Sequence, residues 1–175
     1  MIAKKKKPLL ENLPYRSGVG AVIFNDDGLV WIGCRLLKPG QDIENYWQMP
    51  QGGIDPGEDP ELAVIREVEE ETGTEKVEII DQTPNWINYD LPDNLIGIAW
   101  GGKFRGQTQK WFALRFTGSD ADFNLNNYKK PEFSEWQWTK LAGLPELIVP
   151  FKRELYDEIA AVFGHWPKKI RAQNK

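Results

Sequence analysis

The sequence has very little cysteine and histidine, with one residue of each, Cys34 and His165, among 175 residues. A single cysteine excludes an internal disulfide. No neighbour in the sequence would activate the thiol, so we expect Cys34 to pack as a small apolar side chain in a strand. His165 stands alone near the end of a predicted helix, and we assign it no catalytic role.

Long hydrophobic runs are also missing from the sequence. There is no stretch of about 18 apolar residues, and no apolar signal-peptide segment follows the initial lysines. Pro, Gly and Ser do not gather into a linker that would divide the chain, and no internal repeat is visible. We therefore expect a cytoplasmic protein with one folded domain and no membrane partner.

Positive charge is scarce except near the two ends of the chain. Eight of the 22 Lys and Arg residues lie there, at Lys4–Lys7, Lys168, Lys169, Arg171 and Lys175, whereas all 26 acidic residues lie between Glu11 and Glu158. So acidic a body would repel a polyphosphate unless metal ions mask its charge, which favours a metal-dependent enzyme over a simple anion-binding module. We expect residues 1–13 to be a flexible basic arm, residues 14–165 the folded domain and residues 166–175 a basic C-terminal tail, with no DNA partner.

The segment between residues 52 and 73 is the most informative part of the chain, and it predicts a helix. Asp59 can cap this helix, and Pro60 can occupy the first helical position, where its missing N–H costs nothing. Gly73 can end it. The predicted helix therefore has a defined start and a defined end.

Three glutamates share one face of this helix. At about 100° per residue, Glu67, Glu70 and Glu71 fall within a sector roughly 100° wide. Like charges at this spacing repel each other, so we expect a cation among them. Oxygen ligands without Cys or His nearby suit Mg2+, or Mn2+ in its place, better than zinc. A solvated, glutamate-rich surface is the alternative that the helix alone leaves open.

Residues in and before this helix match the signature of the Nudix hydrolases, G-x5-E-x7-R-E-U-x-E-E-x-G-U, in which U is an aliphatic residue. The matching residues are Gly52, Glu58, Arg66, Glu67, Val68, Glu70, Glu71 and Gly73. Only Thr74 departs from the pattern, at the final aliphatic position, and its β-branched shape is close to that of valine. By this long match the chain resembles the Nudix family.

The resemblance implies a metal-dependent hydrolase of nucleoside diphosphates linked to another group. The metal-site residues that it implies on this segment are Glu67, Glu70, Glu71 and Gly52. Glu58 and Arg66 would support the helix and orient its carboxylates. One carboxylate, which we take to be Glu70, would accept the proton of the attacking water.

The rest of the chain alternates between strand and helix character and predicts an α/β fold. Strands are expected at residues 18–24, 29–35, 77–81, 110–116 and 133–139, a hairpin turn at 25–28, and a second long helix at 149–163. Residues 83–106 are expected to form an exposed excursion with short strands. Together these elements predict a mixed central sheet between helices, an α/β/α sandwich, which agrees with the Nudix fold.

Segments outside the helix resemble one branch of the family, the bacterial RNA pyrophosphohydrolases, which are related to the diadenosine tetraphosphate hydrolases. The segments that carry this resemblance are Tyr15-Arg16, Trp47–Gly53, Asn85–Pro92, Gly106–Phe112, Pro131–Phe133 and Pro150–Arg153. The resemblance extends over about residues 14–164 and leaves only the ends of the chain outside it.

This closer resemblance implies roles for residues on several elements. Glu132 would be a fourth metal ligand, which would close a cage that one helix face cannot complete. The substrate-binding residues that it implies are Arg16, Arg35 and Lys152 for phosphates, Lys110 and Tyr89 as further donors, and Phe151 for a nucleobase. The alternatives are a loop carboxylate at Glu132, a core residue at Phe151 and ordinary surface positions for the cations.

Three functions compete on this basis. We favour removal of pyrophosphate from the 5′ end of triphosphorylated RNA, the step that initiates mRNA decay, because Phe151, Arg35 and Lys152 resemble base-stacking and phosphate positions. Cleavage of dinucleoside polyphosphates such as diadenosine tetraphosphate is the second. A silent domain that binds nucleotides or a partner protein is the third, and the intact acidic signature argues against it.

Overall fold

The computed structural model describes residues 12–36 and 46–174. Within these ranges the strands are β1 (Tyr15–Phe24), β2 (Val30–Arg35), β3 (Trp47–Gln48), β4 (Gln51–Gly53), β5 (Val77–Gln82), β6 (Ile87–Asp90), β7 (Gly106–Phe116) and β8 (Phe133–Thr139). The α-helices are α1 (Pro60–Thr72), α2 (Arg153–Phe163) and α3 (Trp166–Gln173). Short 3-10 helices are η2 (Ala99–Gly102), η3 (Asp120–Asp122), η4 (Leu141–Glu146) and η5 (Pro150–Lys152). Residues 1–11 of the expected basic arm lie outside the described residues.

The eight strands belong to one mixed sheet. Its central pair, β1 and β7, is parallel from the Tyr15–Gly106 pair to the Phe24–Arg115 pair. The other strand pairs in the described residues are antiparallel. The order is β3-β2-β1-β7-β5, with β4 paired to β1, β6 to β7 and β8 to β2. The mixed sheet predicted from the sequence is therefore confirmed.

A tight turn connects β1 to β2, as the sequence predicts. The Asn25 side chain accepts hydrogen bonds from the backbone N–H groups of Asp27 (3.1 Å) and Leu29 (2.9 Å). Gly28 has a φ of 71°, a left-handed conformation that favours glycine. Cys34 lies buried in β2, which agrees with the packing role expected for it.

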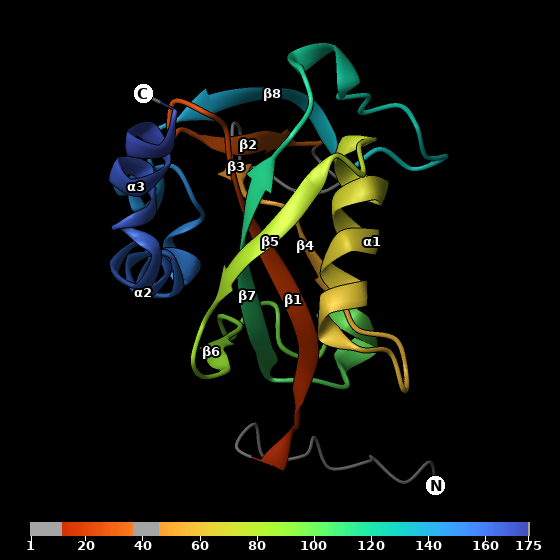
Figure 1. Ribbon diagram of the computed structural model, residues 1–175. Coiled ribbons are helices and arrows are strands. Elements are labelled where there is room, and N and C mark those ends of the chain that lie inside the picture. The colour runs from red at the N-terminus through yellow and green to blue at the C-terminus, as the bar shows by residue number, and fades with distance from the viewer. Residues whose placement is uncertain (1–11, 37–45, 175) are drawn as a thin grey trace, which may run out of the picture.

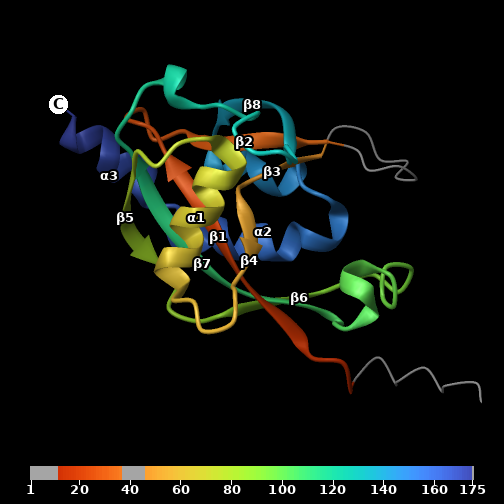
Figure 2. The same ribbon diagram turned by 90° about the vertical axis from the view of Figure 1, so that its right-hand side faces the viewer.

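Helices cover both faces of the sheet, with α1 on one side and α2 and α3 on the other (Figures 1 and 2). Successive side chains of a strand point to opposite faces. Val19 and Ile23 therefore pack in the core that includes the buried residues of α1, whereas Val22 and Phe24 pack in the core that includes those of α2 and α3. Burying each large apolar side chain contributes about 1.5–3 kcal/mol relative to leaving it exposed. The expected α/β/α sandwich is confirmed.

The C-terminal residues differ from the expected basic tail, because residues 166–173 form helix α3. Trp166 and Ile170 lie four positions apart on one face of this helix and are both buried. The indole Nε1 of Trp166 also donates to a carboxylate oxygen of Asp81 (2.8 Å). The many lysines and arginines around these two apolar residues gave the segment its tail-like composition. The folded domain therefore extends beyond residue 165.

No helix within residues 12–36 and 46–174 is long and apolar enough to cross a membrane.

Candidate active site

Helix α1 begins and ends at the predicted residues. The carboxylate of Asp59 accepts a hydrogen bond from the N–H of Glu61 (2.8 Å), and Pro60 occupies the first turn. At the other end Gly73 has a φ of 80° and donates its N–H to the carbonyl of Glu69 (2.8 Å). Because both ends are capped and one side is buried, the helix holds its acidic face in a fixed orientation.

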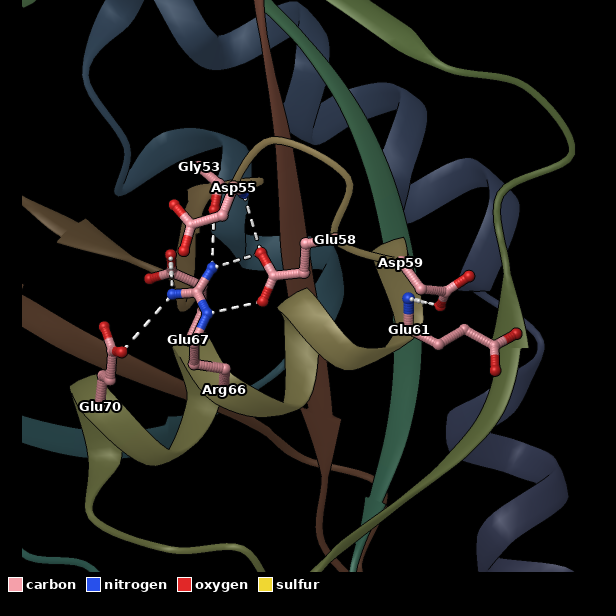
Figure 3. Close-up of polar contacts among 8 residues, drawn as sticks. All are labelled: Gly53, Asp55, Glu58, Asp59, Glu61, Arg66, Glu67 and Glu70. Atoms are coloured by element: carbon pink, nitrogen blue, oxygen red, sulfur yellow. Dashed lines mark hydrogen bonds and ion pairs between the residues drawn. The ribbon is translucent and has the colours of Figure 1, made fainter.

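Arg66 connects the loop before α1 with this acidic face (Figure 3). Its guanidinium donates to both carboxylate oxygens of Glu58 (2.8 and 2.9 Å), to the carbonyl of Gly53 (2.9 Å) and to Glu67 (2.9 Å). It also lies 3.5 Å from a carboxylate oxygen of Glu70. The hydrogen bonds from Arg66 lower the pKa of Glu58 to about 2. These contacts suit the orienting role expected of Glu58 and Arg66, which stays a prediction.

Glycines in β4 give room to charged side chains on either side of this strand. A Cβ at Gly52 would lie 1.9 Å from the carboxyl carbon of Glu67, and a Cβ at Gly53 would lie 2.1 Å from Nη2 of Arg16. Strand β4 is paired with β1, and Gly52 lies opposite Val19. The backbone of Gly52 therefore has little freedom to shift. The structure thus gives Gly52 a steric reason to lack a side chain, and its place among the metal-site residues stays a prediction.

Glu71 and Glu132 approach the same region from different elements. Glu71 accepts a hydrogen bond from the backbone N–H of Gln51 (3.1 Å), and Glu132, just before β8, accepts one from Arg35 (2.5 Å). Burial, together with the negative charges of Glu132 and Glu67, raises the pKa of Glu71 well above its usual range. Burial also raises the pKa of Glu67, although a guanidinium neighbours it. Crowded carboxylates of this kind are stabilised by a cation.

The four carboxylates line one pocket with a volume of about 370 Å3. Its lining residues are Glu67, Glu70, Glu71, Tyr128, Lys129, Lys130 and Glu132. The three glutamates of α1 and the glutamate before β8 therefore meet as the sequence predicts. A larger and more open hollow of about 680 Å3 lies beside it against Phe123, Phe133 and Trp136, but Glu135 is the only acidic residue that lines that hollow in the described part of the chain.

The donor set of the smaller pocket fits a hard divalent cation, because it consists of carboxylate oxygens. Among the described residues, no group of three acidic, histidine or cysteine side chains already surrounds a single point. In this arrangement Arg66 contacts Glu67, and Arg35 contacts Glu132.

Three predicted substrate residues lie together beside this pocket. Lys152 is only 5% exposed, and its Nζ lies 5.1 Å from the ring centre of Tyr89. Burial and the positive charge of Arg35 lower the pKa of Lys152 to about 7, although the nearby carboxylates oppose this shift. The ring of Phe151 lies 6.1 Å from that of Tyr89 and packs partly buried against the core.

A buried chain of hydrogen bonds holds Tyr89 in place. Its hydroxyl donates to the side-chain oxygen of Gln107 (2.8 Å), which also accepts from the amide of Gln109 (2.8 Å). Gln109 in turn accepts from the indole N–H of Trp111 (3.0 Å). Burial raises the pKa of Tyr89. Tyr89 is thereby fixed as a rigid, protonated side chain.

Arg16 lies beside β4 and near Glu67, outside the residues that line the pocket, and its phosphate contact stays a prediction. Its guanidinium lies against Gly53. The positive charge of Arg16 acts to lower the pKa of Glu67, but burial has the larger effect and the pKa is raised overall. The Arg16 guanidinium is also 5.7 Å from the ring centre of Trp100, a residue with a φ of 50° that bulky side chains seldom adopt. The contact with Trp100 was not predicted from the sequence.

Lys110 is a predicted substrate residue that the structure does not bring to the pocket. Its Nζ donates to the carbonyls of Thr83 and Pro84, in the connection between β5 and β6. No hydrogen bond or ion pair among the described residues connects it with the four glutamates.

Sequence reasoning missed Tyr128, Lys129 and Lys130, which line the pocket. A signal was present, because two adjacent lysines directly precede Pro131 and the expected ligand Glu132. The polar segment around them has no helix or strand periodicity, so the sequence alone does not show toward which element its side chains turn.

The chain matches the model of the NUDIX domain over residues 14–159. It therefore belongs to the Nudix family, whose members generally use divalent metal ions. It is 49% identical over 168 residues to a protein named RNA pyrophosphohydrolase from Mesorhizobium japonicum, with 93% of this chain and 97% of that protein covered. A protein of the same name from Brucella ovis is 50% identical over 161 residues, with 89% of this chain and 90% of that protein covered.

Solved structures share the fold at lower sequence identity. The Ap4A hydrolase of C. elegans in a binary complex has a TM-score of 0.59 at 22% identity, with 85% of this chain and 98% of that one covered. The dihydroneopterin triphosphate pyrophosphohydrolase of E. coli has a TM-score of 0.60 at 20% identity, with 83% and 96% covered. These similarities show the Nudix fold itself.

Proposed function

We propose that this protein removes pyrophosphate from the 5′ end of triphosphorylated RNA. The observation that carries the proposal is a pocket lined by four carboxylates in a chain that is 49–50% identical, over about nine-tenths of its length, to proteins named RNA pyrophosphohydrolase. We also propose a cytoplasmic location, because the relatives named above are bacterial proteins and bacteria make their triphosphorylated RNA in the cytoplasm.

We assign the carboxylates of the pocket to metal binding. The residues of this proposed site are Glu67, Glu70, Glu71 and Glu132, with Gly52 beside them. When bound there, Mg2+, or Mn2+ in its place, supplies a Lewis acid that polarises phosphate oxygens and lowers the pKa of a water molecule. Oxygen-only donors are the support for this choice of ions.

In the proposed reaction a water oxygen attacks the phosphorus next to the ribose. A new P–O bond forms between the water oxygen and this phosphorus, and the phosphoanhydride bond breaks. Pyrophosphate is released, and the RNA keeps a 5′ monophosphate. We assign the water proton to Glu70, because its side chain is 36% exposed and that of Glu67 only 13%. The more open carboxylate is the one that a water molecule reaches more easily.

Substrate contacts are proposed for the residues around this pocket. Arg16 and Lys152 would bind phosphate oxygens. Tyr89 would support Lys152 and Phe151 through its ring, because its hydroxyl already donates to Gln107. Phe151 would stack on a nucleobase, for which its ring contact with Tyr89 provides a firm backing. Arg35 would take part once Glu132 is drawn to a cation. The contacts of Lys110 give it no comparable support.

The experiment that tests this function measures release of pyrophosphate from a short 5′-triphosphate RNA by the purified protein. We expect release with Mg2+ and none with excess EDTA. Diadenosine tetraphosphate serves as the competing substrate in parallel assays, and we expect a lower kcat/KM for it than for the RNA. The reverse order would assign the protein to dinucleoside polyphosphates, and no phosphate product from either substrate would assign it a binding role.

A further inference from the structure

The connection between η3 and β8 is fastened at both ends beside the acidic pocket. The N–H of Asn124 donates to the carbonyl of Thr72 at the C-terminal end of α1 (2.8 Å), and the carbonyl of Glu132 accepts the N–H of Leu36, which follows β2 (3.0 Å). Figure 1 shows this connection passing the end of α1 before it enters β8. Backbone hydrogen bonds to two different elements thus set the position of the residues between them.

Within this connection, Tyr128, Lys129 and Lys130 line the pocket that the four glutamates line. Tyr128, which is 40% exposed, adds a hydroxyl donor to this wall of the pocket. The loop accordingly brings one neutral donor and two ammonium groups to a pocket whose opposite wall is acidic.

Three of the other cations near the pocket are engaged by the protein itself. The fourth, Arg16, lies against Gly53 and does not line the pocket. Arg66 contacts the carboxylates of α1 and of the loop before it, and Arg35 contacts the carboxylate before β8. Lys152 is nearly fully buried against the ring of Tyr89. Lys129 and Lys130 differ from these three, because both are exposed and neither forms an ion pair with a residue in the described ranges.

We propose that Lys129 and Lys130 bind the pyrophosphate that leaves, that is, the two terminal phosphates of the triphosphate substrate. This inference rests on the proposed function and adds the residues that recognise the leaving group. A flexible ammonium with three donors suits a phosphate, which it meets as a point charge. A volume of about 370 Å3 is at the small end of ligand pockets and suits a small polyanion better than a whole nucleotide.

The proposal also implies selectivity for the length of the phosphate chain. A triphosphate end offers two phosphates beyond the one that is attacked, and a diphosphate end offers only one. Two lysines side by side therefore contribute more to binding of the triphosphate than of the diphosphate.

The test uses the full chain and its variant with Lys129→Gln and Lys130→Gln together. The matched control is Lys140→Gln, because Lys140 is an exposed lysine that follows β8, whereas Lys129 and Lys130 precede it. The strand between them is seven residues long and spans about 20 Å, and Lys140 is not among the residues that line the pocket. Far-UV circular dichroism and thermal unfolding establish that all three proteins fold alike.

The first readout is binding of inorganic pyrophosphate in the presence of Mg2+, measured by isothermal titration calorimetry. We expect the Kd of the double variant to rise by about five- to tenfold and that of Lys140→Gln to change less than twofold. The second readout is the KM for 5′-triphosphate and 5′-diphosphate RNA, which we expect to rise more for the triphosphate, with kcat changing little.

Equal pyrophosphate affinity in the wild type and the double variant would overturn the inference. A loss of affinity in Lys140→Gln as large as that in the double variant would also overturn it, because it would indicate unspecific electrostatic attraction. Failure of the proposed function looks different, since wild-type protein would then release no pyrophosphate from RNA. The calorimetric comparison assesses the two lysines in either case, because it does not depend on turnover.

Discussion

Gly52 and Glu67 fit so closely together that a Cβ at position 52 would lie 1.9 Å from the carboxyl carbon of the glutamate. The two residues belong to β4 and α1, so this contact sets how near the acidic face of the helix comes to the sheet. Arg66 holds the other side of Glu67 through a hydrogen bond of 2.9 Å. The carboxylate is thus confined between backbone and guanidinium, and small changes on either side should alter its position.

Replacement of Gly52 by alanine should displace Glu67 from this position, because the new methyl group cannot share its space. We expect kcat for the triphosphate RNA to fall by at least about tenfold, since mispositioning a catalytic group by about 1 Å can cost two orders of magnitude. The matched control is Gly143→Ala, at a glycine where a Cβ would meet no neighbour within 4 Å. Unchanged kcat in Gly52→Ala would mean that the position of Glu67 is not critical.

Replacement of Glu70 by glutamine keeps the shape of the side chain and removes one negative charge. We expect turnover to decrease by about two to four orders of magnitude, the range for loss of a general base or critical ligand. Steady-state release of pyrophosphate measures this, with Glu78→Gln on the exposed side of β5 as the control. Near-normal turnover in the purified Glu70 variant would remove this residue from the mechanism.

Helix α3 should contribute to the stability of the domain, because Ile170 is 1% exposed. Ile170→Ala should lower the free energy of unfolding by about 2–4 kcal/mol, the cost of a cavity in a core. Lys168→Ala, on the exposed face of the same helix, should change it by less than about 0.5 kcal/mol. Urea unfolding measures both, and equal stabilities of Ile170→Ala and wild type would support the tail that composition suggested.

The lowered pKa of Glu58 predicts that the stability of the fold depends on pH. This pKa is lowered from 4.5 to about 2 in the folded protein, so the folded state binds fewer protons than the unfolded state between these values. The contribution of Glu58 is therefore fully present above about pH 4.5 and is lost as the pH falls toward about 2. The difference in unfolding free energy between wild type and Glu58→Gln should narrow over this range. A constant difference down to pH 2 would show that the pairing with Arg66 does not stabilise the fold.

The sequence predicted α1 well because local chemistry alone defines this helix. Asp59, Pro60 and Gly73 are residue types with strong preferences at helix ends, and each lies where that preference puts it. Local chemistry also defines the turn at residues 25–28, through the side chain of Asn25 and the left-handed conformation of Gly28. A family signature that spans the helix then added Glu58 and Arg66, whose contact is a local one across a single loop.

Contacts between distant segments were harder to predict. Arg35 is bound to Glu132, 97 positions away, and no pattern in either segment shows that these two charges meet. Lys110 stands in a segment that fits the subfamily, yet its side chain bonds to nearby carbonyls. Helix α3 was missed because two apolar residues among many charged ones give a weak periodicity. Such features depend on tertiary packing, which overrides local composition.

The central claim is that Glu67, Glu70, Glu71 and Glu132 hold a divalent cation. The most direct measurement is an anomalous difference map from crystals of the protein soaked in Mn2+. We predict a peak among these four side chains, with oxygens from at least α1 within about 2.0–2.4 Å of it. A map with no peak in the pocket, and with the glutamates still paired to Arg66 and Arg35, would contradict the account.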